Sequence, residues 1–335
     1  MKRGRLSSSH RSGFTLLELL TASVITMVIL VLVMTITNHA SNIWIWGNSR
    51  VEAFQNARRG FNILTSQLEQ ATLNTYWDYR DSAGNFRSTT VASGFVPHDY
   101  GRKSELHFFV DHAGSGGTPG TKGCGQAVFF QAPGRKANPL HSDYERFVGL
   151  LNACGFYVEW NTDEDWLPTH VDKSTARKRF RLMQMLEDTE DLSIGASPSR
   201  QWVRPTIGNT FVVAEDVIAL VIWPRESGTS TTLNSYGYDS RNDVNSVPQG
   251  MMANQLPSQL QVAMVAVDET IVARLGDGHE AAIKKCLDGL FFSDPAEKGQ
   301  GDLQTLEQRL RQAGIGYRVF QSSIQMREAR WGGQQ

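Results

Sequence analysis

The pattern of apolar positions changes twice along the chain. From Phe14 to Ile36 nearly every residue is apolar, and Glu18 is the only charged side chain in that stretch. At about 1.5 Å per residue, these 23 residues form a helix of about 34 Å, which is long enough to cross a hydrocarbon core of about 30 Å. We therefore predict a transmembrane helix over residues 14–37.

Beyond this stretch the apolar residues recur at helical spacing. Intervals of three and four residues separate Val51, Phe54, Ala57, Phe61, Leu64, Leu68 and Ala71. Such spacing is typical of an amphipathic helix, and the sequence contains no proline between residues 14 and 96. We predict that residues 38–75 continue the first helix and bury this stripe against a folded head.

The head, residues 76–335, is patterned mainly as β-strands. The predicted strands cover residues 104–110, 126–131, 147–160, 179–186, 210–224, 260–268 and 317–326, and a short helix covers residues 303–313. Gly155 indicates a bulge, and the second half of 210–224 is apolar enough for a central strand. The predicted fold class is α+β, with a long N-terminal helix packed on an antiparallel β-sheet head.

Three segments of the head offer candidate binding chemistry. The glycine-rich residues 114–125 lack the Gly-Lys-Ser/Thr ending of a phosphate loop and connect two predicted strands, so we interpret residues 104–131 as a hairpin. Residues 225–257 form a long polar loop, a type that is often functional, and a metal site there stays open. The aromatic residues Tyr76, Trp77 and Tyr79 either form a binding surface or, as we favour, pack the helix end against the sheet.

Charge, cysteine content and motifs exclude several classes of function. The formal net charge is -1 for the 335 residues, and the basic residues of the leader make the rest mildly acidic, so no nucleic-acid partner is expected. The sequence has neither a Gly-x-Ser-x-Gly element nor a zinc His-Glu-x-x-His motif, and we expect no enzyme and no cofactor. Of the three cysteines, Cys124 and Cys154 could form a disulfide in an oxidising compartment.

The N-terminal motif is the most specific feature of the sequence. A basic leader with Lys2, Arg3, Arg5 and Arg11 precedes Gly13-Phe14, and Glu18 follows at the start of the apolar helix. This order resembles the processing site of the type IV pilin and pseudopilin superfamily. The resemblance implies that prepilin peptidase removes residues 1–13, that Phe14 is N-methylated, and that Glu18 becomes the fifth residue of the mature chain.

A carboxylate at the start of a membrane helix is costly. A charge at mid-membrane costs about 2.5–3.5 kcal/mol on insertion scales, so Glu18 is a functional candidate. The resemblance implies that Glu18 meets the free α-amine of a neighbouring subunit during assembly, and a buried charge is tolerated when it is paired. Alternatively, Glu18 lies at the membrane interface and only caps the helix, in a Thr15-x-x-Glu18 start.

Two other N-terminal signals fit less well. A secretory signal peptide has a shorter apolar core, and a plain membrane anchor does not need the Gly13-Phe14 and Glu18 pattern. Because basic residues stay on the cytoplasmic side, we expect a single-pass inner-membrane protein with a cytoplasmic N-terminus and a periplasmic head.

Later segments carry a narrower resemblance. Residues 70–79 (QATLNTYWDY), LPSQLQVAMVAVDE and YRVFQSSIQMREARW resemble Verru_Chthon cassette protein C, a prepilin-type family. The 210–224 and 256–268 strands with their polar connection also resemble J-type minor pseudopilins. Both resemblances imply export and assembly.

The sequence therefore supports two functional hypotheses. The first is a minor pilin or pseudopilin subunit of a type IV pilus- or type II secretion-like filament. Its partners would be prepilin peptidase, other pilin-like subunits and an assembly platform in the inner membrane. The alternative is a membrane-anchored periplasmic binding or adhesion module that does not assemble and binds a ligand through loops 114–125 and 225–257.

Overall fold

The structure of the protein is a computed structural model. It describes residues 15–87, 94–134, 150–164, 167, 170–173, 176–187, 200–225, 236–268, 278–291 and 295–329. Gly13, Phe14 and the basic leader lie outside the described residues. The chain forms two compact units, Met1–Val51 and Glu52–Gln335, and each is described by itself.

The first unit contains the beginning of helix α1 (Leu16–Leu68). Its segment Leu16–Trp44 has 29 residues, a mean hydropathy of 2.7 and no buried residue, so it is long and apolar enough to cross a membrane. The serine and threonine hydroxyls of this segment bond back to the helix: Thr26 Oγ1 donates to the Ala22 carbonyl at 2.7 Å, and Thr35 Oγ1 donates to the Val31 carbonyl at 2.8 Å. Such bonds allow a hydroxyl to enter an apolar medium, because its donor is satisfied within the helix.

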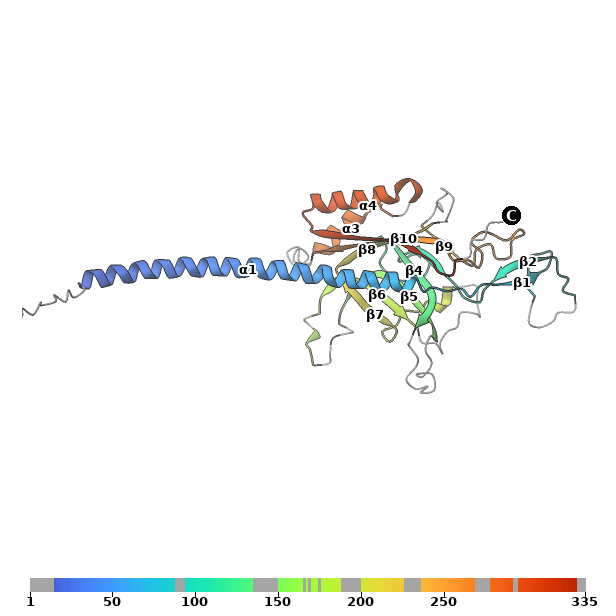
Figure 1. The fold of residues 1–335 in the computed structure, drawn as a ribbon, viewed down its shortest axis with the longest axis horizontal. Helices are drawn as coiled ribbons and strands as arrows, with labels where there is room; N and C mark the ends of the chain where they lie inside the picture. Colours follow the sequence, from blue (N-terminus) through green and yellow to red (C-terminus); the bar gives the residue numbers. More distant parts are fainter. Residues whose placement is uncertain are drawn as a thin grey trace, which may run out of the picture. The chain divides into compact units, whose positions relative to one another are not determined.

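The described residues of the second unit form three antiparallel sheets and two helices in addition to the end of α1 (Figure 1). The six-stranded sheet has the order β7-β6-β5-β4-β3-β9, the three-stranded sheet β11-β10-β8, and the small sheet β1-β2. The strands are β1 (Tyr76–Arg80), β2 (Asp99–Lys103), β3 (Phe109–His112), β4 (Gln126–Gly134), β5 (Leu150–Thr162), β6 (Lys178–Leu186), β7 (Thr210–Glu215), β8 (Val217–Arg225), β9 (Tyr238–Asp239), β10 (Gln259–Val267) and β11 (Tyr317–Gln325). The described residues also include the 3-10 helix η4 (Arg200–Trp202) and helices α3 (His279–Leu287) and α4 (Pro295–Gln312). The α+β fold with a long N-terminal helix and antiparallel sheets is confirmed.

The C-terminal turns of α1 form the centre of the core. The predicted stripe is buried: Ala57 and Phe61 are 1% and 6% exposed, and Leu64 and Leu68 are 0% exposed. The helix contacts both larger sheets. The Phe61 ring lies 6.0 Å from that of Phe320 on β11, and a Cβ added to Gly60 would lie 2.9 Å from the Ala214 Cβ of β7.

The two larger sheets meet at the start of β4. Gly125 has a φ of +92°, and a Cβ there would lie 2.1 Å from the Leu220 carbonyl oxygen of β8, so only glycine fits. Next to it, the buried Gln126 side chain accepts a bond from the Ile222 amide at 3.0 Å and donates to the Phe291 carbonyl at 3.2 Å. These contacts join β4 to β8 and to the segment after α3.

The structure divides the predicted strand 210–224 in two. Asp216 has a φ of +57° and separates β7, in the six-stranded sheet, from β8, in the three-stranded sheet. The prediction that the second half forms a central strand was wrong, because β10 is central and β8 is at the edge. β8 is apolar on both faces because the rest of the second unit buries it.

Other strand predictions differ in detail. The 104–131 hairpin is confirmed, with β3 paired to β4, but β3 begins only at Phe109. The bulge predicted at Gly155 is absent, since β5 pairs with β4 and β6 in unbroken register there. The glycine instead leaves room for a ring, because a Cβ at Gly155 would lie 2.2 Å from Phe129 Cδ1.

Replacing Gly125 tests the junction between the sheets. Gly125→Ala should lower the free energy of unfolding by about 1–3 kcal/mol more than Gly123→Ala, because overpacking adds to the backbone strain. Gly123 is the matched control, since its φ is also +92° and a Cβ there would meet nothing within 4 Å. The measurement is denaturant unfolding of both full-length variants in detergent. Equal losses would show that the close approach to Leu220 has no energetic consequence.

Candidate functional site: the N-terminal helix and the surface of the second unit

The N-terminus of α1 is closed by a reciprocal cap. Glu18 Oε2 accepts bonds from the Thr15 amide at 3.0 Å and from Thr15 Oγ1 at 3.1 Å, and the Glu18 amide donates to Thr15 Oγ1 at 3.3 Å. This is the capping-box arrangement that the sequence predicts. The carboxylate also lies at the positive end of the helix dipole. These bonds hold the Glu18 side chain against its own helix end.

Around this carboxylate the helix is apolar on every side. The large apolar side chains from Leu16 to Ile36 are between 53% and 81% exposed in the isolated chain. A helix that is hydrophobic all round belongs in a membrane or among other helices. Glu18 is thus a single anionic group on a surface made for an apolar environment.

Comparison with known families agrees with this geometry. Residues 8–34 match the family model described as the prokaryotic N-terminal methylation motif. The N-terminal segment is of the prepilin type. The motif supports a type IV pilin- or pseudopilin-like protein, and a motif of this type implies processing by prepilin peptidase and association with other pilin subunits. No curated protein matches the chain.

The prepilin-type segment and the apolar helix fit a single-pass membrane anchor. Sequence reasoning found this site because its residues are adjacent in the chain, where a motif can specify them. The second unit holds the other candidates, and there the structure brings together residues that are far apart in sequence.

The glycine-rich loop 114–125 is folded onto the six-stranded sheet. The Thr121 amide donates to the Val158 carbonyl at 2.9 Å, and Thr121 Oγ1 accepts from the Trp160 amide at 2.7 Å. A Cβ at Gly120 would lie 2.9 Å from the Val158 oxygen. Gly120 therefore serves close packing, and the Thr121 amide is bonded to the sheet and is not free to bind an anion.

The described part of the second loop, residues 236–257, is held by two arginines. Arg80 Nη1 donates to the Ser246 carbonyl at 2.9 Å, and Arg102 Nη2 donates to the Gly250 carbonyl at 2.7 Å. Residues 226–235 of the predicted loop lie outside the described residues. Within the part of the chain that the structure describes, no group of three or more His, Cys, Asp or Glu side chains could hold a metal ion.

The candidate disulfide is not formed in this structure. Cys124, Cys154 and Cys286 are free thiols, and all three are buried. Burial raises the pKa of Cys124 and of Cys154 to about 12, so both remain protonated and unreactive at neutral pH. In this structure the two thiols therefore act as small core residues.

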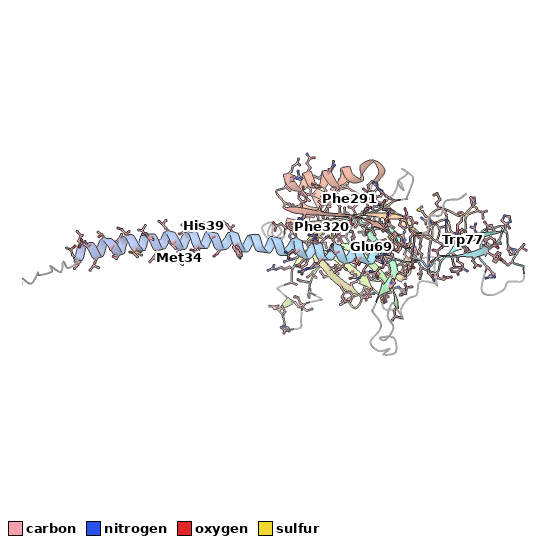
Figure 2. The ribbon with its side chains drawn as sticks, in the orientation of Figure 1. Met34, His39, Glu69, Trp77, Phe291 and Phe320 are labelled. Carbon is pink, nitrogen blue, oxygen red and sulfur yellow. The ribbon has the colours of Figure 1, made fainter. Side chains whose placement is uncertain are left out.

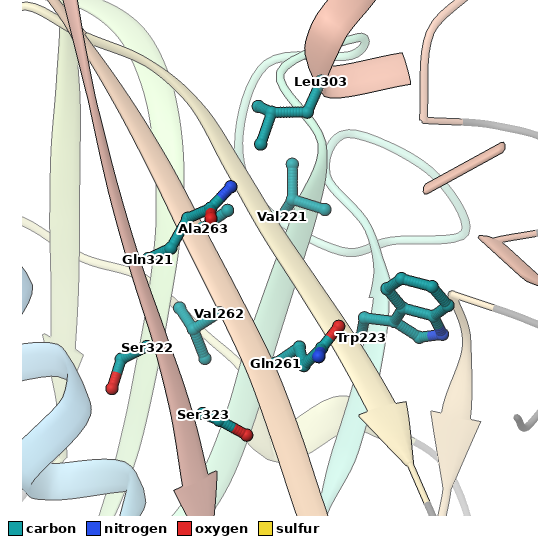
Figure 3. A pocket seen from close by; sticks show the side chains of 9 residues that line it. All are labelled: Val221, Trp223, Gln261, Val262, Ala263, Leu303, Gln321, Ser322 and Ser323. Atoms are coloured by element: carbon teal, nitrogen blue, oxygen red, sulfur yellow. The ribbon is translucent and has the colours of Figure 1, made fainter. Parts of the chain in front are cut away.

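A groove lies on the face of the three-stranded sheet that carries Gln261 (Figure 3). It has a volume of about 290 Å³ and is lined from β8, β10, β11 and α4. The Gln261 and Gln321 amides come from neighbouring strands, Trp223 lies at one side, and Leu303 of α4 lies at one end. Among the described residues, the side chains that line this groove are uncharged.

A buried polar network joins β3, β9 and η4, and the sequence pattern did not reveal it. His107 is 0% exposed, and its Nε2 lies 2.7 Å from Asp239 Oδ1. Trp202 Nε1–H donates to His107 Nδ1 at 3.2 Å, and Arg200 pairs with both Asp111 and Asp239. Because an indole only donates, Nδ1 must be the acceptor and Nε2 the protonated nitrogen. His107 is therefore neutral in this network.

The aromatic residues after α1 are exposed, contrary to our favoured interpretation. Trp77 is 68% exposed, and Tyr76 and Tyr79 are 40% and 38% exposed. They lie on the β1–β2 ribbon, whose two strands are not among those predicted from the sequence. Packing of the helix end against the sheet is instead achieved by Leu68, Ala71 and Leu73, which are at most 2% exposed.

The His107 network predicts a specific pH dependence. Burial lowers the pKa of His107, although its bond to Asp239 opposes this effect. As the pH falls, His107 of the unfolded chain is protonated near the ordinary histidine pKa of about 6.5. His107 of the folded chain is protonated only at a lower pH. The associated stability is complete above about pH 6.5 and decreases as the pH falls towards the lowered pKa of the folded state.

His107→Gln removes this titration. The variant should unfold more easily at pH 7.5, by about 1–3 kcal/mol for a disturbed buried bond, and should lose less further stability than the wild type between pH 7.5 and 5. Unfolding curves of the full-length protein in detergent at both pH values measure this difference. Equal pH dependence in the two proteins would contradict a neutral, buried His107.

Proposed function

We propose that this protein is a minor pilin or pseudopilin-like subunit that acts by assembly into a type IV pilus- or type II secretion-like filament. The observation that carries the proposal is the prepilin-type motif at residues 8–34, which includes Glu18 and overlaps the exposed apolar helix Leu16–Trp44. A surface of that kind requires a membrane before assembly and neighbouring helices afterwards.

Processing would take place between Gly13 and Phe14. Prepilin peptidase would remove residues 1–13 on the cytoplasmic side, and the new α-amine of Phe14 would be methylated. The head would then face the periplasm, because the basic leader stays inside. The remaining partners would be other pilin-like subunits and an assembly platform in the inner membrane, and the late sequence segments support the Verru_Chthon cassette protein C family.

Glu18 would pair with the α-amine of a neighbouring subunit. Its Oε2 is engaged by Thr15 of its own helix, and a carboxylate has room for further donors at its two oxygens. Among apolar helices an unpaired carboxylate is costly, and a complementary amine removes that cost at one axial register only. The large head, residues 76–335, favours a minor or tip position, where a bulky domain need not repeat along the fibre.

The first test is the N-terminus of the protein from its native membrane. Intact-mass measurement and N-terminal sequencing should give a chain that starts at Phe14 and carries one added methyl group. A chain that keeps residues 1–13 in cells with active prepilin peptidase would contradict the proposal and favour a plain anchor.

The second test separates pairing from capping at Glu18. Glu18→Gln keeps an oxygen that can accept the two Thr15 bonds but removes the negative charge. If the charge pairs with a neighbouring amine, the amount of Glu18→Gln protein in sheared filaments should fall by about tenfold or more, which corresponds to about 1.4 kcal/mol or more of lost pairing. Glu18→Ala should fall at least as far, with the second unit still folded.

Glu69→Gln is the matched control for charge removal, at the residue that follows the other end of α1. Glu69 is partly exposed and lies 3.8 Å from Arg327, within the second unit. This variant should enter filaments like the wild type. Normal assembly of Glu18→Gln would leave Glu18 with the capping role alone.

The alternative hypothesis, a membrane-anchored binding or adhesion module, is favoured by one observation. Trp77 on the β1–β2 ribbon is 68% exposed, and such a large exposed aromatic ring is typical of a binding surface. Binding and assembly can coexist in one protein, since Trp77 and Glu18 belong to different units of the chain. Retention of ligand binding by Glu18→Ala protein that no longer assembles would identify binding as a separate property.

A further inference from the structure

The β1–β2 ribbon has two chemically different faces. Directly opposed residues of an antiparallel pair lie on the same face, so the register places Asp78, Arg80 and Asp99 on one face. Arg80 is 2% exposed and bonds to Asp99 at 2.5 Å and to the Ser246 carbonyl at 2.9 Å. This face therefore fastens the ribbon to the rest of the second unit.

The opposite face, which we term the aromatic face, carries Trp77, Tyr79 and Tyr100. They are 68%, 38% and 60% exposed, and Figure 2 shows Trp77 among the side chains of the ribbon. The rings of Tyr79 and Tyr100 form a cross-strand pair with centroids 4.6 Å apart. The stability of the ribbon accounts for the presence of these two rings, because cross-strand aromatic pairs stabilise a two-stranded ribbon. Trp77 adds a third exposed ring that the stability of the ribbon does not require.

A polar pocket of about 130 Å³ begins beside Trp77. Six of its nine lining residues are polar or charged, including Arg102, Asn254, Gln255 and Glu328. It therefore offers hydrogen-bond donors and acceptors next to a flat apolar ring. A ligand that matches both has apolar ring faces and hydroxyl groups at its edges, which is the chemistry of a sugar ring.

The cationic side chains around the aromatic face already pair with or donate to oxygen atoms of the protein. Lys103 pairs with Asp78 at 3.1 Å, and Arg87 lies 3.6 Å from the same carboxyl group. Arg102 donates to the Ala253 and Gly250 carbonyls at 3.1 and 2.7 Å. Because Lys103 and Arg102 already donate to protein oxygens, fewer of their donors remain for a phosphate group, and we therefore favour a neutral ligand over nucleic acid or an acidic lipid.

We propose that the aromatic face and the adjoining pocket form a binding site for a neutral oligosaccharide. The ring of Trp77 would stack on the apolar face of one sugar, and the Tyr79–Tyr100 pair would support the next. The pocket lined by Asn254 and Glu328 would receive hydroxyl groups. This site is independent of N-terminal processing and goes beyond the proposed assembly role.

The test is calorimetric titration of the full-length protein with neutral hexasaccharides of β-linked glucose and of β-linked N-acetylglucosamine. The protein is held in a zwitterionic detergent, because detergents with sugar headgroups would compete for the site. Binding of at least one hexasaccharide is expected, and Trp77→Ala should weaken it by about tenfold or more, equivalent to about 1.4 kcal/mol or more. Tyr100→Phe should bind with little change, because it keeps the ring.

Trp44→Ala is the matched control. Trp44 is 77% exposed, comparable with Trp77, but lies in the first unit, so its loss should not change the affinity. The far-ultraviolet circular dichroism of Trp77→Ala should match the wild type, since the removed ring is exposed. Processing at Phe14 should also be normal in this variant, which separates failure of this site from failure of the assembly role.

Three outcomes would overturn the proposal. The first is that neither hexasaccharide binds the wild type. The second is that Trp77→Ala binds as tightly as the wild type does. The third is that Trp77→Ala changes cross-linking to another pilin-like subunit while no sugar binds, which would make the aromatic face a protein interface instead.

Discussion

The packing of the last turns of α1 between two antiparallel sheets is the contact on which the second unit depends. Phe61, Leu64 and Leu68 are buried in the same core as residues from both sheets. A single sheet cannot exclude water from its own apolar face. The helix covers that face of each sheet and so completes the core. The junction at Gly125 and Gln126 also joins the two sheets directly.

The two halves of α1 suit two different environments. Its second half carries apolar residues on one stripe, because water and protein meet along it. Its first half is apolar all round, and its hydroxyl groups bond back to the helix, as in Thr26 and Thr35. A single carboxylate at Glu18 is the exception, and its position in the first turn lets the backbone amides of the helix end and the Thr15 hydroxyl stabilise it. The Glu18 carboxylate is thus stabilised in the isolated chain and remains available for pairing with a further donor.

The β1–β2 ribbon adds a surface of exposed aromatic rings to the second unit. Its inner face uses Arg80, which is almost completely buried, to reach Asp99 and the loop around Ser246. A ribbon fixed in this way can expose Trp77 and Tyr100 on its outer face without losing its own order. The protein can therefore carry a recognition surface that is structurally separate from the segment that anchors and assembles it.

The sequence by itself determined the elements whose signals are local. The α1 stripe and the strands at residues 179–186 and 260–268 follow from periodicity within one segment, and the prepilin-type motif follows from adjacent residues around Phe14. The tertiary structure decided what depends on distant partners. His107 and Asp239 meet although 132 residues separate them. Asp216 divides one apolar stretch between two sheets, and β1 was missed because its buried positions are charged residues satisfied from other segments. Periodicity reports which faces are apolar, but only the folded chain shows which polar groups find partners inside and which aromatic rings remain outside.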